Sequence, residues 1–361
     1  MSAMRFREVR REAGRNLSSG ASRAVLLMLL VAAGSATLAA LDTAEMTGVI
    51  RAAEDFRARG ASITILAAED SIDGRACDAL GRVDGVRAAG ALAERETPLR
   101  VASIPQNPLT YFESSPGFAT MLPAATGGTE PGLLMPIAVV ETLGLTLGDP
   151  IQTADGPTTL GGTYEYPDDG RTTGMAYAAI APIAPDSKFD ECWIDAFPVS
   201  QATIELLYTA IAADSNLPDT GPQLSQHNLQ LGKPVNPESA FAGRATGAFP
   251  LAGFGIGAMI GFGAVWLRRL EIASAFHVGV QRSDQTVTLL LEALAWSCAG
   301  ALVAFPAIAL LTQNLAASDL IPVAATAALT PALTVSGAIL GTLAAALLVR
   351  ERRLFSYFKG R

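Results

Sequence analysis

The residues that could carry chemistry in this sequence are few and scattered. It has two histidines, His227 and His277, and neither stands at a spacing from other His, Cys, Asp or Glu residues that is typical of a zinc site. The sequence contains no G-x-x-x-x-G-K-[ST] loop for nucleotide phosphates and no G-x-S-x-G nucleophile elbow. We therefore expect that this chain is not an enzyme and that it binds no metal or cofactor itself.

Two short acidic stretches are the remaining candidates for a ligand site. They are EYPDDGR, residues Glu165 to Arg171, and DECW, residues Asp190 to Trp193. Either could bind calcium or a cationic ligand through its carboxylates. Acidic residues beside glycine and proline more often form solvated turns, and we favour that interpretation.

A charged stretch between two hydrophobic runs stands out for a different reason. LRRLEIASAFHVGVQRSDQTVTLLLEA, residues 267–293, continues directly into the second of these runs. Ile272, Phe276 and Val280 repeat every four residues and can form one apolar stripe on a short helix. Such a helix could dock in a groove of a soluble partner and pass force to the hydrophobic segments, or it could only anchor the loop at the membrane surface.

The same stretch predicts a helix, a turn and then a long helix. Gly279 can end or turn the first helix, Ser283 suits the N-cap of the second, and Asp284 suits its positively polarised first turn. Glu292 then lies inside a hydrophobic helix. It could pair with a basic residue of this loop or of the N-terminal segment, or it could extend towards water.

The elements that must position these residues are membrane helices. The chain has 361 residues, of which 50% are hydrophobic and 17% charged, and this composition is unusual for a soluble domain. Hydrophobic runs long enough to span a bilayer lie at 24–41, 245–267, 286–311 and 321–349. The prolines at positions 306 and 331 should kink the last two.

The first run could instead be a signal peptide, because small residues follow it. However, 23 residues with six arginines precede the run, and this is long for the n-region of a signal peptide. We favour a membrane span at 24–41, preceded by an amphipathic helix in residues 1–23.

Basic residues predict the orientation. They concentrate in residues 1–23, 268–285 and 350–361, whereas most of the acidic residues lie in 42–244. The positive-inside rule therefore places both termini and the 268–285 segment in the cytoplasm. Residues 42–244 are predicted to lie outside and to carry a negative net charge.

The outer segment has the pattern of an α+β domain. DTAEMTGVIRAAEDFRARG and SIDGRACDALGRV have helical spacing, ASITILAA is typical of a strand, and a hairpin is predicted to turn at Asp155-Gly156. The Gly- and Pro-rich stretches near 123–132 and 216–236 indicate loops or linkers.

The three cysteines agree with this topology. Cys77 and Cys192 both fall in the outer domain, where an oxidising compartment favours a disulfide over two buried free thiols. Cys298 falls inside the third span, where we expect ordinary helix packing.

Glycines mark one face of the second span. Gly253, Gly257 and Gly261 follow one another at four-residue steps, and such small-residue faces let helices approach closely. We predict that this face packs against the first span or against a second copy of the chain. The alternative is a glycine face that is exposed to lipid.

Several of these residues carry a resemblance to a known family. The pattern of Arg269, Glu271-Ile272, Gly279, Ser283-Asp284 and LLLEA at 289–293 resembles the corresponding segment of MacB/FtsX-like permeases, the membrane subunits of type VII ABC transporters. The order of one span, a large outer domain and three further spans is also similar. The family's N-terminal amphipathic helix has a counterpart in a stripe at helical spacing, formed by Phe6, Val9, Ala13 and Leu17. The sequence departs from the pattern at Leu270, where the family often has Arg, and in the Ala-Phe-His run at 275–277.

The resemblance implies a fold and a set of partners. The fold would be four transmembrane α-helices in the bacterial inner membrane, with a large extracytoplasmic α+β domain inserted between helices 1 and 2. Two permease chains, identical or paralogous, would pair with two copies of a separate cytoplasmic ABC ATPase that binds ATP and Mg. An extracytoplasmic lipoprotein or other accessory protein could join them, and nucleic acid has no part in it.

The resemblance also implies a mechanism. The cytoplasmic segment would transmit movements of the ATPase to the outer domain, so that a substrate is exported by mechanotransmission. Its contact residues would be Arg268, Arg269, Glu271, Ile272, Phe276, Gly279, Ser283 and Asp284. The alternative is an FtsX-like signalling permease that regulates an extracellular partner, such as a cell-wall hydrolase. The large outer domain favours export.

Overall fold

The computed structural model describes residues 6–20, 22–127, 132–215, 217, 221–232 and 236–350. The chain divides into two compact units, which we call the helical unit (up to Arg51 and from Glu238 onward) and the sheet unit (Ala52–Pro237). The predicted tail at 350–361 lies outside the described residues, except for Arg350.

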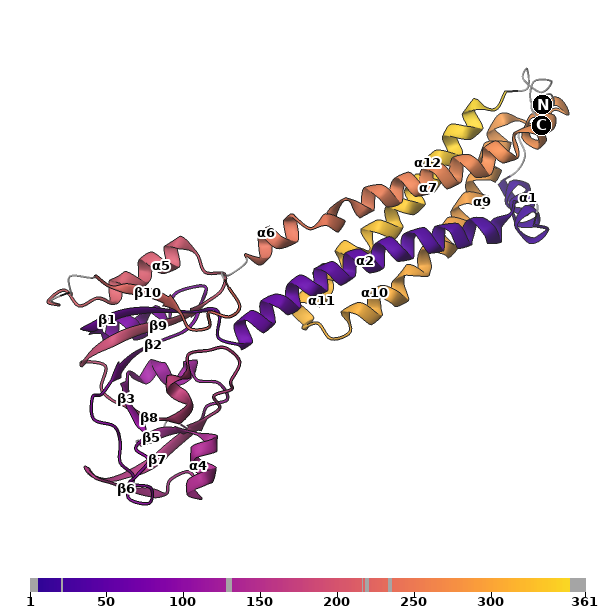
Figure 1. Cartoon of the computed structure of the whole chain (residues 1–361). Coiled ribbons are helices and arrows are strands. Elements are labelled where there is room, and N and C mark those ends of the chain that lie inside the picture. Colours follow the sequence, from indigo (N-terminus) through magenta and orange to yellow (C-terminus); the bar gives the residue numbers. More distant parts are fainter. Residues whose placement is uncertain are drawn as a thin grey trace. The chain divides into compact units, whose positions relative to one another are not determined.

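The helical unit contains the membrane-spanning candidates. Among the described residues, four helical stretches are long and apolar enough to cross a membrane: Ala24–Ala58, Ala245–Leu267, Arg282–Thr312 and Ala317–Leu348. They comprise α2 (Ala24–Ala58), η4 (Ala245–Ala248) with α7 (Phe249–Leu267), α9 (Arg282–Leu302) with α10 (Ala304–Thr312), and α11 (Ala317–Ala327) with α12 (Leu329–Leu348), as Figure 1 shows. A helix long and apolar enough to cross a membrane is present at each of the four predicted spans, and the sheet unit lies in the chain between the first and the second.

Prolines interrupt the third and fourth spans as predicted. Pro306 follows the end of α9 at Leu302 by four residues, and Pro331 follows the end of α11 at Ala327 by the same interval. A proline ring clashes with the carbonyl four residues earlier and removes one hydrogen bond, so each helix ends at that residue and a new one begins. Pro322 is instead accommodated inside α11.

The first span is longer than its apolar run. The predicted span at 24–41 and the predicted helix that starts at Asp42 are one helix, α2, of 35 residues. At about 1.5 Å per residue it is roughly 50 Å long, more than the roughly 30 Å of a hydrocarbon core. The two compact units divide within α2, after Arg51. The predicted outer segment at 42–244 began earlier, at the end of the hydrophobic run.

The sheet unit is built on one mixed sheet. Among the described residues ten strands join, in the order β10-β1-β9-β2-β3-β8-β5-β7-β4, with β6 paired to β7. The strands are β1 (Ile63–Asp73), β2 (Val86–Glu94), β3 (Thr110–Ser114), β4 (Thr126–Gly127), β5 (Leu133–Pro136), β6 (Pro150–Thr153), β7 (Gly156–Tyr164), β8 (Ala178–Pro182), β9 (Lys188–Ala196) and β10 (Gln223–Gln226). The predicted hairpin is β6–β7, in which Thr153 pairs with Gly156 across the turn.

Alternating side chains place apolar groups on both faces of this sheet. On one face, α3 (Gly74–Leu80), α5 (Gln201–Leu207) and η3 (Tyr208–Ala210) cover Leu66, Phe189 and Ile194. On the other, η1 (Pro116–Met121) and η2 (Thr173–Tyr177) cover Ile65 and Trp193. Helix α4 (Ile137–Leu143) packs beside β5 and β7 on a third cluster. The period-two alternation predicted from the sequence therefore serves a sheet buried on both sides.

The predicted disulfide is present. Cys77 of α3 is bonded to Cys192 of β9, and the two residues are separated by 115 positions. Both sulfurs lie in the apolar cluster under α3 and α5. The bond fixes α3 to a central strand of the sheet, and a link that closes so long a loop contributes up to about 4–5 kcal/mol in the chain-entropy model.

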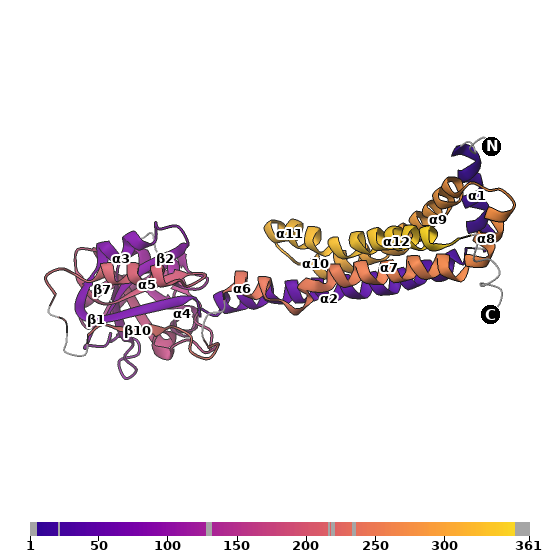
Figure 2. The ribbon, with the colours of Figure 1, turned by 90° about the horizontal axis from the view of Figure 1, so that it is seen from above.

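The glycine face of α7 packs closely, but against a different helix from the one we predicted. Gly253, Gly257 and Gly261 face α12, the second helix of the fourth span, and not the first span or a second copy. A Cβ at Gly257 would collide with the Thr334 carbonyl oxygen, and one at Gly261 with that of Ala338. Successive glycines along α7 meet successively later residues of α12, so the two helices run in parallel. They lie side by side in Figure 2.

The close approach is reciprocal. Gly337 and Gly341 of α12 face the backbone of α7 at Phe254 and Ala258. Two interlocked rows of glycines bring the backbones together along the membrane-spanning part of both helices. The first span has a close contact of its own, because a Cβ at Gly300 of α9 would lie 2.6 Å from the Met28 carbonyl oxygen of α2.

The α7–α12 contact makes a prediction about Gly257→Leu. The new side chain would have to displace the α12 backbone, and we expect a loss of about 1–3 kcal/mol of stability. The matched control is Gly255→Leu, since an added Cβ at Gly255 meets nothing within 4 Å. Thermal unfolding of the full chain in nanodiscs measures both variants. Equal unfolding temperatures would contradict the packing described here.

Candidate functional site

The loop between the second and third spans is a short helix held between two longer ones. Helix α7 ends at Leu267, Arg268 caps both that end and the start of α8 (Arg269–His277), and Val278 caps the end of α8. Gly279 follows with φ 96°, a conformation that favours glycine. The predicted order of helix, turn and long helix is what the structure has.

The start of the third span differs in detail from the prediction. The N-cap of α9 is Gln281 and not Ser283, and its side chain makes no capping bond. Ser283 and Asp284 both fall in the first turn. There the carboxylate of Asp284 lies near the positive end of the helix, as expected. Ser283 was predicted as the N-cap on residue type alone. The turn instead ends at Gln281, so the helix begins at Arg282.

The apolar stripe of α8 faces inward. Ile272 and Ala273 are buried with Val265 of α7, Leu289 of α9 and Ala346 of α12, and Phe276 is partly buried beside them. Ile272 therefore fixes α8 to the membrane helices, and it is not on the surface that a partner could contact. The suggestion that this stripe docks in a partner's groove is wrong for Ile272.

The outward face of α8 is polar. The side chain of Glu271 is 70% exposed, and Ser274 and His277 are exposed as well. The turn continues this surface through Gly279 and Ser283, both exposed. Of the eight residues proposed for coupling, three are exposed where a soluble partner could reach them: Glu271, Gly279 and Ser283. Four are partly buried, namely Arg268, Arg269, Phe276 and Asp284, and Ile272 is buried.

Two guanidinium groups strengthen this turn. Arg269 donates to the Trp266 carbonyl oxygen at 3.3 Å and lies over the Trp266 ring, 5.3 Å from its centroid. Arg282 lies over the Phe276 ring at 5.5 Å. Cation–π contacts of this kind join the start of α9 to α8 and the start of α8 to the end of α7.

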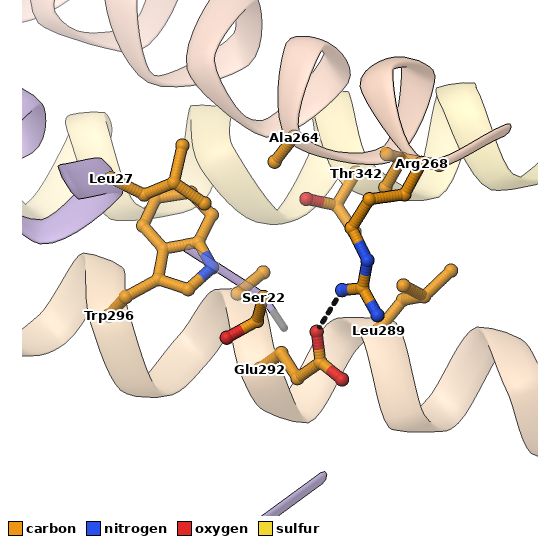
Figure 3. Close-up of a pocket in the computed structure, with 10 residues that line it drawn as sticks. Ser22, Leu27, Ala264, Arg268, Leu289, Glu292, Trp296 and Thr342 are labelled. Carbon is orange, nitrogen blue, oxygen red and sulfur yellow. Dashed lines mark hydrogen bonds and ion pairs between the residues drawn. The ribbon is translucent and has the colours of Figure 1, made fainter. Parts of the chain in front are cut away.

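The intramembrane carboxylate is the centre of an ionic cluster. Arg268 donates from Nη1 to Glu292 Oε2 at 2.7 Å, and Asn16 of α1 (Phe6–Ser18) donates from Nδ2 to Glu292 Oε1 at 2.6 Å. The Glu292 side chain is 4% exposed and that of Arg268 14%. Figure 3 shows the arginine extending from the end of α7 to the carboxylate. Of the alternatives for Glu292, pairing with a basic residue of the loop is the observed one.

The cluster joins four segments of the chain. Arg268 also donates from Nε to Glu271 Oε2 at 3.3 Å, which connects the buried carboxylate to the exposed face of α8. Beside the pair lies a cavity of about 10 Å³, lined by Ser22, Leu27, Thr342 and others, enough for about one water molecule. An ion pair buried this deeply is expensive to break, because the remaining charge would be left without a partner.

The N-terminal helix packs against α9 through part of its predicted stripe. Val9 and Ala13 are buried, Leu17 is half-buried and Phe6 is 65% exposed. Val9, Ala13 and the bond from Asn16 to Glu292 thus attach α1 to the base of the third span.

At the other end of the helical unit a second ionic cluster joins the first and second spans. Asp42 of α2 is fully buried, and its Oδ1 accepts bonds from Arg244 Nε at 3.0 Å and from Thr246 Oγ1 at 2.6 Å. Glu45 accepts bonds from the backbone N–H groups of Ala245 and Thr246. From the sequence, Asp42 was predicted only as the first residue of the outer segment. An acidic residue and an arginine that border successive spans are the signal that could have indicated this pair.

In the sheet unit, polar side chains cap the end of α2. Arg171, with a side chain 3% exposed, donates to the Ala58 carbonyl oxygen at 3.0 Å and pairs with Asp169. Asn228 donates to the Arg59 carbonyl oxygen at 3.0 Å. A cation at the C-terminal end of a helix satisfies free carbonyls and opposes the helix dipole. The last turn of α2 is therefore fixed to the sheet.

The histidine of the sheet unit belongs to this junction. His227 is 2% exposed, its Nδ1 lies 3.0 Å from Thr172 Oγ1, and its ring centroid lies 4.6 Å from that of Trp193. Burial, together with the neighbouring Arg171 charge, lowers the pKa of His227 from 6.5 to about 4. His227 is a neutral packing residue at physiological pH.

Each acidic stretch makes structural contacts within the sheet unit, so neither is a simple solvated turn. Asp169 and Arg171 of the first form the buried pair that caps α2. The second lies within β9, where Glu191 accepts a bond from Trp193 Nε1 at 2.7 Å. In the part of the chain that the structure describes, no group of three or more His, Cys, Asp or Glu residues could hold a metal ion.

Comparisons with known proteins add little to this geometry. No protein family and no curated protein matches the sequence. Among solved structures, the crystal structure of the periplasmic region of MacB from Actinobacillus actinomycetemcomitans is similar at 8% identity and a TM-score of 0.36. The similarity covers 49% of this chain and 94% of that one. A TM-score of this size does not establish a shared fold.

The ionic cluster predicts a strong effect of Glu292→Gln. Arg268 would remain largely buried without its main counter-charge, and we expect a loss of about 3–5 kcal/mol of stability. Glu271→Gln removes the exposed partner of the same arginine and should cost at most about 1 kcal/mol. The double variant Arg268→Met with Glu292→Met should recover most of the loss. Unfolding of the full chain in mixed micelles measures all three, and equal effects of Glu292→Gln and Glu271→Gln would contradict the buried pair.

The pKa of His227 predicts a pH dependence. The unfolded chain takes up a proton near pH 6.5, but the folded chain resists protonation until about pH 4. The free energy of unfolding should therefore fall as the pH is lowered through this window, by up to about 3 kcal/mol, and be restored above it.

The two histidines provide the test. Thermal unfolding of the full chain at several pH values should show a shallower pH dependence for His227→Gln than for the unmodified chain. His277→Gln, which removes the other histidine at an exposed position, is the matched control. Identical slopes for the two variants would exclude His227 as the cause.

Proposed function

We propose that this chain is the membrane subunit of an ABC transporter whose ATPase is a separate chain. In this proposal the chain is not catalytic. The partner ATPase binds ATP and Mg in the cytoplasm, and two permease chains, identical or paralogous, assemble with two ATPase chains in a bacterial inner membrane. Both termini face the cytoplasm, in accordance with the distribution of basic residues. The outer domain extrudes a substrate by mechanotransmission.

One observation carries the proposal. Arg268 lies between α7 and α8 and caps both. Its side chain donates hydrogen bonds to the buried Glu292 of α9 and to the exposed Glu271 of α8. A partner that displaces the outward face of α8 must therefore act on two spans at once. A loop whose only role was to connect the spans would not need a buried ion pair at its first residue, since the pair is expensive to desolvate.

The rest of the helical unit supports transmission of such a movement. Ile272 fixes α8 to α7, α9 and α12 through one apolar cluster. The glycine rows hold α7 and α12 together as a parallel pair. Asp42 and Arg244 join α2 to the start of the second span. A displacement at the base is therefore carried along packed helices, and it does not require a polar channel between them.

The chain connection to the outer domain supports it as well. Helix α2 runs without a break from the first span into the sheet unit, and Arg171 and Asn228 cap its last turn. Rotation or axial movement of α2 would act directly on the segments that carry Arg171 and Asn228.

A crosslinking experiment tests the proposal. A photoreactive amino acid placed at Ser274 or at His277, both on the outward face of α8, should crosslink in native membranes to a chain that mass spectrometry identifies as an ABC ATPase. The control position is Met259 of α7, 69% exposed among apolar neighbours, where no ATPase should be captured.

Two results would refute the proposal. One is the absence of an ATPase from the products at both α8 positions while the chain is folded and abundant. The other is labelling of a cysteine at position 274 by a membrane-impermeant reagent added to intact cells, which would place α8 outside the cytoplasm.

A further inference from the structure

A cavity of about 280 Å³ lies in the sheet unit where the end of α2 meets β2 and β9. Its lining consists of Arg57, Gly85, Val86, Arg87, Asp195 and Phe197. Two of these residues are arginines, in a part of the chain with many more acidic than basic residues. The volume is near the lower limit of small-molecule sites, which suits a ligand of a few heavy atoms.

Arg87 is placed in this cavity by an irregularity in the sheet. Val86 pairs with Ala196 and Ala88 pairs with Asp195, so Arg87 is an additional residue in β2 at a β-bulge. Bulges redirect a side chain that would otherwise follow the pleat. Gly85, with φ 87°, provides the turn that precedes the bulge.

A buried carboxylate then holds the guanidinium. Asp195 is 2% exposed and accepts a bond from Ser62 Oγ at 2.7 Å. Its Oδ2 accepts bonds from both Nε and Nη2 of Arg87. Arginine has five N–H donors, so three remain for a ligand. The Arg87 side chain is 60% exposed, and these donors are accessible.

Arg57 supplies the second charge from the last turns of α2. In the described residues its contact is with the Phe197 ring, 5.8 Å from the guanidinium carbon to the centroid. The neighbouring Arg59 differs, because it pairs with Asp55 at 3.0 Å and does not line the cavity. Arg57 is thus oriented by an aromatic face and keeps its hydrogen-bond donors available.

The chemistry of the lining indicates an anion with a small apolar part. A carboxylate is satisfied by a single arginine fork, whereas a phosphate group has enough oxygens to accept from two guanidiniums that come from different elements. Val86 and Phe197 offer apolar surface beside the charges. Asp195 neutralises one arginine, so the lining keeps a net positive charge for an anionic ligand.

We propose that this cavity binds a phosphate ester of about the size of a glycerophosphate headgroup. The ester could be free in the extracytoplasmic space or could be the headgroup of a membrane lipid. This binding goes beyond the proposed function and does not rest on it, since no ATPase is needed. Because Arg57 belongs to α2, an occupied site would add a contact between that helix and the sheet.

Calorimetric titration of the full chain tests the proposal. The chain is purified in dodecyl maltoside, a detergent without phosphate, and titrated with glycerol 1-phosphate in one arm and with short-chain phosphatidylglycerol in the other. We expect saturable binding in at least one arm, weakened about tenfold or more by Arg57→Gln through the loss of charge-assisted hydrogen bonds. Binding of the soluble ester identifies a free ligand, and binding of the lipid alone identifies a membrane headgroup.

Arg59→Gln is the matched control. It removes the same charge two residues further along the chain, just after the end of α2 and outside the cavity, and it should leave the affinity within about twofold of the unmodified chain. Arg87→Gln is not suitable as the primary test, because it would leave the buried Asp195 carboxylate with fewer partners. The proposal is overturned if neither probe binds, or if Arg57→Gln and Arg59→Gln weaken binding equally.

Discussion

A carboxylate inside an apolar helix constrains everything around it. Glu292 is nearly inaccessible, and a charge at such a position needs a partner of opposite sign together with further hydrogen bonds. Arg268 and Asn16 meet that need from two different segments. The positions of the end of α7, the start of α8, the N-terminal helix and α9 therefore depend on one side chain. Ile272 can be buried beneath α8 because this arrangement holds α8 against the spans.

The rest of the helical unit is held by a different kind of interaction. Between α7 and α12 the contacts are made by backbone atoms, since the glycines at 253, 257 and 261 leave no side chain in the way. In an apolar solvent close packing is favourable where the hydrophobic effect is not available. Directional ionic clusters lie at the ends of the helices, where Glu292 and Asp42 have partners, and close packing operates along their length.

The sequence predicted features that depend on local chemistry. Apolar runs identified all four spans, the prolines at 306 and 331 identified the breaks within two of them, and Gly279 identified the turn after α8. The Cys77–Cys192 bond followed from the number and location of the cysteines. None of these predictions needed knowledge of which segments meet in space. The disulfide needed only the prediction that both cysteines lie on the same, oxidising side of the membrane.

Features that depend on distant partners were missed or misplaced. A glycine row indicates that a helix approaches closely, but it does not indicate which one, and α12 was not identified as the neighbour of Gly257. An apolar stripe on α8 does not reveal whether Ile272 faces a partner or the same chain. The pair formed by Asp42 and Arg244 joins residues 202 positions apart, and what the two share in the sequence is only that each borders a predicted span.

The distribution of helix breaks indicates which element is suited to carry force. The third and fourth spans are each interrupted, at Val303 and at Ala328, and an interrupted helix can bend where its hydrogen bonds are lost. Helix α2 contains no proline in its 35 residues and remains one hydrogen-bonded element into the sheet unit. Its last turn is capped by Arg171, so that end cannot fray without exposing a buried guanidinium. In the function proposed above, a movement that begins at the base of the spans would be absorbed in part by the broken helices, whereas α2 would carry it to the start of β1 at Ile63.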